Sequence, residues 1–388
     1  YWDLEEGKSY FVTRNGSSMI AFHLPKKDFQ GFHIVASHSD SPTYRIKEQP
    51  EMSVEKHYTK LNIERYGGMI PETWFDRPLS VAGRIIIEEN GQIKDQLVNI
   101  DRDLMIIPNL AIHMSRSSNE SKQLNPQKDL LPLCGGNLTK DGFEEMIAKE
   151  SGVEKEDILS YDLFLYNRMR GTTLGINEEF VAAPKLDDLE CAYSSIEGML
   201  NAKLSKDYVT VCAVFDNEEV GSGTKQGAGS TFFPEVLKRI SYLCGKNEEE
   251  YYMAVADSFM LSADNAHAVH PNYQDKTDPT NRPYINEGIV LKYNASQKYT
   301  TDANSAALVK YLCKKEKIKC QVFFNRSDML GGSTLGNILT GQVSIKAADI
   351  GLPQLSMHST YETAGCKDLD DMITLLGSFY ELGKEVQI

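Results

Sequence analysis

Basic residues, paired cysteines and long apolar runs are all in short supply in this 388-residue chain. Lysine and arginine total 41 against 55 aspartates and glutamates, which gives a formal net charge of −14. We expect no nucleic-acid partner, because binding to phosphates needs clustered cations. No apolar run reaches the roughly 18 residues of a transmembrane helix, so no membrane partner is expected either.

The cysteines also argue against a secreted or disulfide-built protein. Their number, seven, is odd and none forms a CxxC pair. Scattered thiols of this kind are typical of a reducing compartment, so we expect a cytoplasmic protein without a cysteine-based zinc site. The first residues show neither a basic n-region nor an apolar core, so we expect no signal peptide in the sequence, which does not begin with methionine.

Strand-like and helix-like segments alternate over much of the chain. Apolar, β-branched runs at 32–36 and 209–215 have the character of buried strands, and apolar residues recur at helical spacing over 189–200 and 369–382. Such alternation predicts an α/β fold with a largely parallel central sheet flanked by helices. The length suggests two domains.

A second pattern occupies residues 78–177. Two strand-like runs, 84–87 and 96–98, flank an Asn90-Gly91 turn, and a polar stretch (115–132) precedes a helical pattern near 141–150. We interpret 78–177 as a smaller β-rich domain inserted into a main domain formed by 1–77 and 178–388.

Histidine is scarce, at eight residues, so its positions are informative. His38 follows the first buried strand, and Asp40 lies two residues on, a spacing that suits a metal-binding imidazole oriented by a carboxylate. Glu218 and Glu219 directly follow the strand 209–215, where α/β sheets place their sites. Two adjacent glutamates can divide metal binding and proton transfer, although each motif alone is more typical of a solvated polar turn.

Further candidates also lie at the ends of predicted elements. Asp187 opens a helix, where aspartate is most often an N-cap. Asp264 lies in the histidine-containing segment 262–270, and His358 follows an apolar run. Considered together, His38, Asp187, Glu219, Asp264 and His358 can bind two divalent ions, whose charge three carboxylates and a hydroxide would balance. Motifs of other hydrolases, HExxH and GxSxG, are absent from the sequence.

Seven motifs, in order, resemble the aspartyl aminopeptidase family of dinuclear zinc metallopeptidases. They occupy residues 10–15, 38–42, 73–77, 184–187, 216–222, 262–273 and 357–359. The resemblance covers nearly the whole chain. It implies a mixed α/β domain of the zinc exopeptidase type, a β-rich inserted domain used in dimerisation and assembly, and a homo-oligomer that closes into a tetrahedral dodecamer.

The resemblance also implies a role for each matched metal-binding residue. His38 and Asp264 would hold one metal ion, Glu219 and His358 the other, and Asp187 would bridge both. Zinc is the expected metal, and manganese and cobalt are alternatives because sites built from His, Asp and Glu also accept them.

Five other residues receive roles by the same match. Glu218 corresponds to the general base and Asp40 to a residue that orients the site. His270 corresponds to a histidine that contacts the substrate or its tetrahedral intermediate. His113 corresponds to one that reaches into a neighbouring subunit's site, and Lys292 to a lysine that lines the pocket for the substrate's first side chain.

The implied function is removal of N-terminal residues, acidic ones by preference, from short peptides. Three alternatives remain open at this point. One is an aminopeptidase of the same mechanism that prefers neutral residues, and another is a two-metal deacylase or amidohydrolase. The third is a binding protein without activity on a peptidase fold, for which the complete set of matched residues is unfavourable.

Overall fold

The computed structural model describes residues 1–115, 123–138 and 141–385. Contacts within the chain divide it into two compact units. The first unit comprises residues 1–41, 172–357 and 362–388, and the second comprises 42–171 and 358–361. Among the described residues, no helix combines the length and apolar character that crossing a membrane would require.

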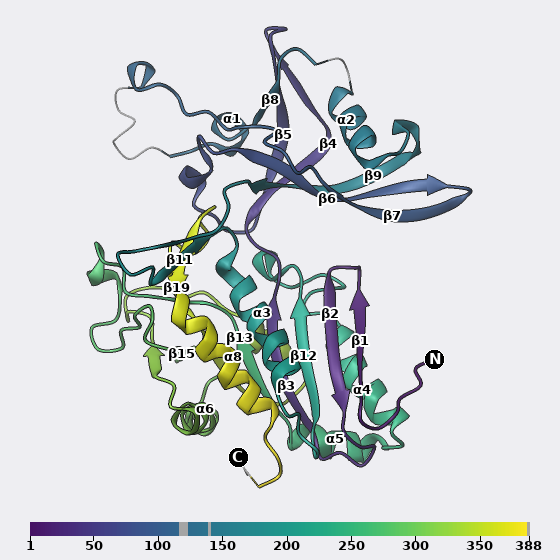
Figure 1. Ribbon diagram of the computed structural model, residues 1–388, viewed down its shortest axis with the longest axis vertical. Coiled ribbons are helices and arrows are strands. Elements are labelled where there is room, and N and C mark those ends of the chain that lie inside the picture. The colour runs from purple at the N-terminus through teal and green to yellow at the C-terminus, as the bar shows by residue number, and fades with distance from the viewer. Residues whose placement is uncertain (116–122, 139–140, 386–388) are drawn as a thin grey trace. The chain divides into compact units, whose positions relative to one another are not determined.

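An eight-stranded sheet forms the centre of the first unit (Figure 1). Its strands, in spatial order, are β1 (Lys8–Arg14), β2 (Ser18–Leu24), β12 (Val209–Phe215), β3 (Phe32–His38), β13 (Phe259–Ala263), β17 (Lys346–Gly351), β15 (Ile289–Lys292) and β16 (Cys320–Phe323). The four central strands β12, β3, β13 and β17 run parallel, and the β1–β2 hairpin and β15 add antiparallel pairs. The predicted mixed, largely parallel sheet is confirmed.

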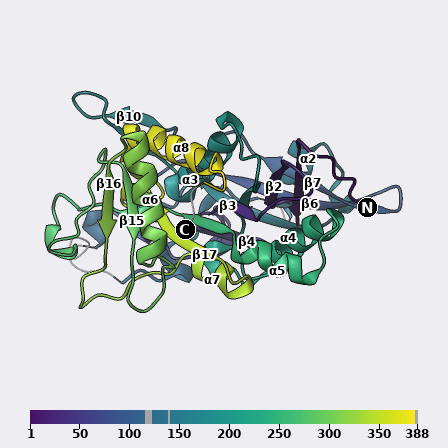
Figure 2. The ribbon, with the colours of Figure 1, turned by 90° about the horizontal axis from the view of Figure 1, so that it is seen from below.

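Helices cover both faces of this sheet (Figure 2). The helices α4 (Phe232–Leu243), α5 (Glu248–Ala256) and α7 (Leu335–Gln342) pack on one face, and α3 (Leu186–Asn201), α6 (Ala303–Glu316) and α8 (Cys366–Tyr380) on the other. Ile34 and Ala36 of β3 join the core of the first face and Val35 joins that of the second. Strands buried on both faces explain the unbroken apolar runs of the sequence.

A smaller five-stranded sheet completes the first unit. It contains β10 (Thr172–Leu174), β11 (Phe180–Ala183), β19 (Glu362–Gly365), β18 (Pro353–Leu355) and β14 (Ala266–His267), in that order. β14 directly follows β13 in the sequence, and β18 directly follows β17. The parallel pairing of β14 with β18 therefore holds together the two segments that continue from these central strands.

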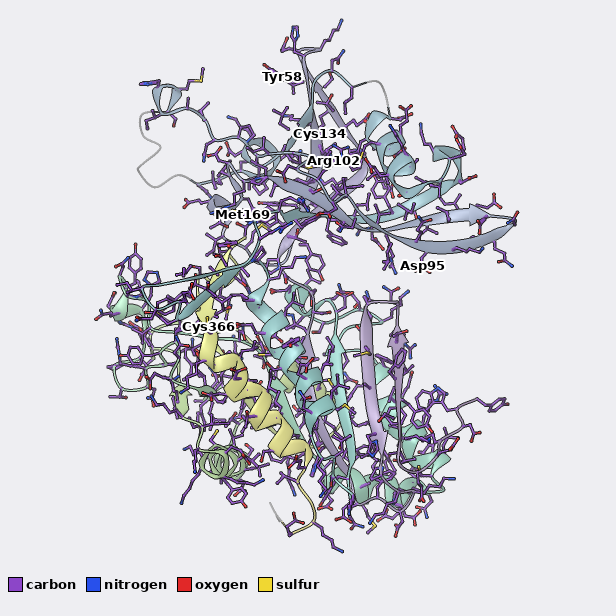
Figure 3. All side chains as sticks on the ribbon, viewed as in Figure 1. Tyr58, Asp95, Arg102, Cys134, Met169 and Cys366 are labelled. Carbon is purple, nitrogen blue, oxygen red and sulfur yellow. The ribbon has the colours of Figure 1, made fainter. Side chains whose placement is uncertain are left out.

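The second unit is built on a six-stranded antiparallel sheet. Its strands, in spatial order, are β7 (Gln92–Asn99), β6 (Leu79–Glu89), β9 (Ile158–Asn167), β4 (Thr43–Val54), β5 (Tyr58–Tyr66) and β8 (Leu133–Gly135). The β6–β7 hairpin turns at Asn90 and Gly91, whose φ angles of 55° and 75° are those of the turn that the Asn-Gly pair predicts. The side chain of Asp95 is labelled on this hairpin in Figure 3. The predicted helix near 141–150 is α2 (Gly142–Ser151).

The contact units differ from the predicted ranges over residues 42–77, 172–177 and 358–361, and the largest difference is at 42–77. Because β4 and β5 pair within the six-stranded sheet, residues 42–77 group with the inserted segment rather than with the first unit. Of the predicted polar stretch 115–132, residues 116–122 lie outside the described residues, and the remainder includes the short helix α1 (Pro126–Asp129).

Candidate metal centre

His38 is the last residue of β3 and is 1% exposed. Its Nε2 atom lies 3.5 Å from Oδ1 of Asp187 and 3.9 Å from Oδ1 of Asp264. Its Nδ1 atom lies 3.1 Å from the carbonyl oxygen of Asp40 and 3.4 Å from the Oδ1 atom of the same residue. Burial opposes protonation of the ring, but hydrogen bonds to Asp187 and Asp40 outweigh it and raise the pKa of His38 well above its usual value. Each of the two ring nitrogens of His38 thus has at least one carboxylate oxygen within 4 Å.

Asp187 is held in place through its backbone. Its dihedral angles, φ −82° and ψ 109°, are not helical although it lies at the start of α3. The amide of Asp187 donates to Oε2 of Glu362 at 2.9 Å, and its carbonyl oxygen accepts from Oγ of Ser41 at 3.1 Å. The next residue, Asp188, accepts with Oδ2 from the backbone amide of His38 at 3.2 Å. Both aspartates therefore contact His38: Asp187 lies beside the His38 ring, and Asp188 accepts from the His38 backbone amide.

The turn after β12 carries Glu218 and Glu219. The two carboxylate oxygens of Asp40 accept hydrogen bonds from the backbone amides of both glutamates, each at 3.1 Å. Burial, followed by the charge of Asp264, raises the pKa of Glu218 to about 7. Burial, followed by the charge of Asp187, raises the pKa of Glu219 to about 10. Asp40 therefore connects the end of β3 to this turn, as a residue that orients the site would.

The segment after β13 brings Asp264 to the same place. Burial raises the pKa of its carboxyl group, and the Lys292 ammonium opposes this shift. Lys292, the last residue of β15, donates to the carbonyl oxygens of Asp264 at 2.7 Å and Asn265 at 3.2 Å. Its Nζ atom also lies 3.6 Å from Oδ2 of Asp264. Burial alone lowers the pKa of Lys292, but the Asp264 carboxylate more than compensates and raises it.

The chemistry of these donors fits divalent metal ions. Potential ligand atoms of His38, Asp188 and Asp264 lie within 4.8 Å of one another, and so do those of His38, Glu218 and Glu219. Imidazole and carboxylate are the ligands that zinc and manganese accept. Burial, followed by the charges of neighbouring carboxylates, raises the pKa of Glu218, Glu219 and Asp264, so their anionic forms need a compensating cation. Divalent ions would provide the missing positive charge.

Three histidines that were predicted as site residues have no contact described so far with the group around His38. His270 is half-buried after β14, and its Nδ1 accepts from the amide of Asn272 at 3.1 Å. Its ring centroid lies 5.0 Å from that of Tyr273, and the two ring planes are tilted by 47°. His113 is exposed in the short helix Ile112–Met114 of the second unit. His358 also groups with the second unit, where its carbonyl oxygen accepts from the amide of Ile70 at 3.1 Å. The roles expected for these three histidines rest on the resemblance.

The sequence did not reveal two residues that support the centre. Glu362 binds the amide of Asp187 across 175 positions of sequence, so no local pattern connects them. Asn265 follows Asp264, and its Nδ2 donates to the carbonyl oxygen of Leu186 at 3.0 Å. Only the adjacency of Asn265 to a candidate ligand could have drawn attention to it.

Comparison with known proteins gives matches along nearly the whole chain. A family model described as "Aminopeptidase I zinc metalloprotease (M18)" matches residues 1–380. The chain is 46% identical to "Probable M18 family aminopeptidase 2" of Clostridium novyi (strain NT), over 98% of this chain and 90% of that protein. It is 38% identical to the protein of the same name from Pseudomonas aeruginosa (strain UCBPP-PA14), over 98% of this chain and 89% of that one.

Solved structures give the same result for the fold. A chain of the "Cryo-EM structure of the Ape4 and Nbr1 complex" is similar with a TM-score of 0.93 and 38% identity, over 97% of this chain and 77% of that one. A chain of the "Structure of S. cerevesiae mApe1 dodecamer" is similar with a TM-score of 0.83 and 28% identity, over 97% of this chain and 85% of that one.

Proposed function

The chain belongs to the M18 family of zinc metallopeptidases and is an aminopeptidase, and from this premise we propose how its residues act and on which substrates. We propose that it removes aspartate or glutamate from the N-termini of short peptides with the help of two divalent metal ions. The observation that carries the proposal is the buried group of carboxylates around His38, at the ends of β3, β12 and β13.

The proposed metal ligands fall into two sets that share one residue. His38 and Asp264 would hold one ion, Glu219 and His358 would hold the other, and Asp187 would contribute to both. The short distances from His38 Nε2 to Asp187 and Asp264 support the first set. The resemblance supports His358. We propose zinc as the native metal, in keeping with the family's description, with manganese and cobalt as substitutes that the same ligands accept.

The protein's own residues then divide the work of peptide hydrolysis. When bound, the metal ions supply an activated water and polarise the carbonyl of the first peptide bond. Glu218 takes the proton of the attacking water and passes it to the leaving amine, the role of a positioned general base. Asp40 keeps the Glu218 backbone in place through its hydrogen bond to the amide. His270 contacts the substrate carbonyl or the tetrahedral intermediate.

The excess of carboxylates also supports cleavage at the N-terminus rather than within a peptide. A free α-amine is a cation at neutral pH, and a neighbouring carboxylate binds it well. A substrate whose amine is acetylated loses this partner, so the proposal distinguishes an aminopeptidase from a deacylase or amidohydrolase that acts on acylated amines.

For the first side chain of the substrate, we propose an acidic preference in which Lys292 supplies the positive charge. Lys292 is 2% exposed, and a desolvated cation attracts a carboxylate more strongly than one in water. Two of its protons are already bonded to the carbonyl oxygens of Asp264 and Asn265. The acidic preference therefore rests on the positive charge of Lys292, whose Nζ atom also lies 3.6 Å from Oδ2 of Asp264.

We also propose a closed homo-oligomer, a tetrahedral dodecamer, in which His113 acts in a neighbouring subunit's site. The similar S. cerevisiae structure is a dodecamer by its own description. We propose a cytoplasmic location as well, which the absence of any disulfide among the seven cysteines supports. Two of these cysteines, Cys134 on β8 and Cys366 at the start of α8, are labelled in Figure 3.

A substrate panel tests the proposed function. Metal-reconstituted protein is assayed on dipeptides that begin with aspartate, glutamate, leucine or alanine, and on N-acetylated versions of the same peptides. The proposal expects the largest kcat/KM for the two acidic residues and no cleavage of the acetylated forms. A preference for leucine would contradict the acidic claim alone, whereas preferential cleavage of acetylated substrates would favour the deacylase alternative.

A further inference from the structure

Lys292 is among the most deeply buried charged side chains in the described part of the chain. A lysine seldom has so little exposure unless it is paired, because an isolated buried ammonium loses its hydration without compensation. The ring of Tyr299, whose centroid is 5.2 Å from Nζ, covers one side of the ammonium. The polar partners of Nζ are the carbonyl oxygens of Asp264 and Asn265 and the Oδ2 atom of Asp264.

The two carbonyl oxygens accept hydrogen bonds from the ammonium group, and Oδ2 of Asp264, at 3.6 Å, adds an ion pair. All three belong to two consecutive residues, Asp264 and Asn265, so the lysine acts on one short segment of chain. The segment follows β13, whereas Lys292 ends β15, and β17 lies between the two strands in the sheet. The Lys292 side chain thus reaches over the end of β17 to hold the segment that carries a proposed metal ligand.

The end of β17 holds the same peptide from another side. The amide of Asp264 donates to the carbonyl oxygen of Ile350 at 3.0 Å. At Gly351, the last residue of β17, a Cβ atom would lie 2.1 Å from the carbonyl oxygen of Asp264. The backbone of Asp264 therefore fits closely between β17 and the Lys292 ammonium, with no room for an alternative path.

The same arrangement distinguishes the two carboxylate oxygens of Asp264. Oδ2 lies 3.6 Å from the Lys292 ammonium, and Oδ1 lies 3.9 Å from Nε2 of His38. An ion pair on one oxygen leaves the other directed at the imidazole and the neighbouring Asp187. Outer partners of this kind orient a ligating carboxylate and affect how tightly the metal binds.

We propose that Lys292 is a positioning residue that holds Asp264 with Oδ1 directed to the metal centre, so that metal affinity depends on Lys292 even when no substrate is present. The inference rests on the proposed function in one respect, namely that Asp264 is a metal ligand. This positioning role differs from the proposed substrate-binding role of Lys292. Loss of the substrate-binding role alone would lower kcat/KM for acidic substrates and leave zinc affinity unchanged.

The test is a zinc titration of metal-free protein against a chromophoric chelator, which needs no activity. Lys292→Met keeps the length of the side chain and removes its charge and its donors. We expect one of the two zinc ions to bind at least about tenfold more weakly, the scale of an outer-partner effect on metal affinity. The control is Lys298→Met. Lys298 is half-buried, so it is less buried than Lys292, and it likewise donates to a backbone carbonyl, that of Gly331 at 3.0 Å. The control should bind zinc like the wild type.

A double-mutant cycle with Asp264→Asn shows whether Lys292 acts through Asp264. In the Asp264→Asn background, Lys292→Met should weaken zinc binding much less than it does in the wild type. Zinc affinity in Lys292→Met that equals or exceeds the wild-type value would overturn the inference. If Asp264→Asn itself leaves zinc binding unchanged, the proposed ligand set fails instead. If circular dichroism shows that Lys292→Met does not fold, the same zinc titration is made on Lys292→Gln. Zinc affinity equal to or above the wild-type value in that variant would likewise overturn the inference.

Discussion

Crowding of like charges is the main property of the centre at the scale of single residues. His38 lies among Asp40, Asp187 and Asp264 at distances below 4 Å, and all of these side chains are largely withdrawn from water. Carboxylates packed in this way share protons or bind cations, because their mutual repulsion is not screened by solvent. Each residue in the group therefore has a separable task that substitution can reveal.

The task of Glu218 is tested by Glu218→Gln. The change keeps the shape of the side chain and removes the proton acceptor, so kcat should fall by about a hundredfold or more while both metal ions stay bound. The measurement combines steady-state kinetics with elemental analysis of the same sample. Near-normal turnover at full metal occupancy would exclude Glu218 as the base.

The bridging role of Asp187 makes a prediction about metal content. A carboxylate shared by two dications offsets the repulsion between them. Asp187→Ala should therefore lose both metal ions, whereas His358→Ala should weaken the binding of mainly one. Metal counting on dialysed protein gives the answer. Two ions retained in Asp187→Ala would instead point to Asp188, which accepts from the backbone amide of His38 and lies as close to the site.

At the scale of elements, the centre is assembled from the ends of strands. The sequence predicted β3 and β12, because both are apolar runs that end in polar, chemically active residues. It did not predict the contact of Glu362 with Asp187, because the two residues are 175 positions apart in the sequence. It also did not assign β4 and β5 to the inserted unit. β5 pairs with β4, and the pairing of β4 with β9 is a long-range contact that no local turn signal indicates.

Gly351 provides a prediction at this scale. A Cβ atom at residue 351 would meet the carbonyl oxygen of Asp264 at 2.1 Å, so Gly351→Ala must push the end of β17 away from the segment after β13. We expect a lower melting temperature and weaker zinc binding. Gly341→Ala is the matched control, because no heavy atom lies within 4 Å of a Cβ there. Equal melting temperatures and zinc affinities for the two variants would contradict this account.

At the scale of the whole molecule, net charge and the proposed assembly would limit which substrates are used. A chain of net charge −14 repels an acidic peptide at long range, so an acidic preference must come from short-range contacts rather than from steering. A closed shell would further restrict access to short, unfolded peptides. Both arguments place the selection of substrates at the site itself and at the entrances of the assembly.

The proposed exchange of His113 between subunits can be tested by complementation. His113→Ala and Glu218→Gln should each have low activity alone. In co-expressed mixed oligomers, a Glu218→Gln subunit would supply His113 to a neighbour whose own Glu218 is intact, so part of the activity should return. Sedimentation checks that both variants assemble. No recovery in assembled mixed oligomers, or a fully active monomer, would show that His113 serves only its own subunit.

The most direct measurement of the central claim is a zinc titration of metal-free protein with an aspartyl dipeptide as substrate. The account predicts no turnover without metal, a rise that is complete at two ions per chain, and no cleavage of the N-acetylated dipeptide at any zinc concentration. Full turnover in protein shown to be metal-free by elemental analysis, or equal cleavage of the acetylated dipeptide, would contradict it.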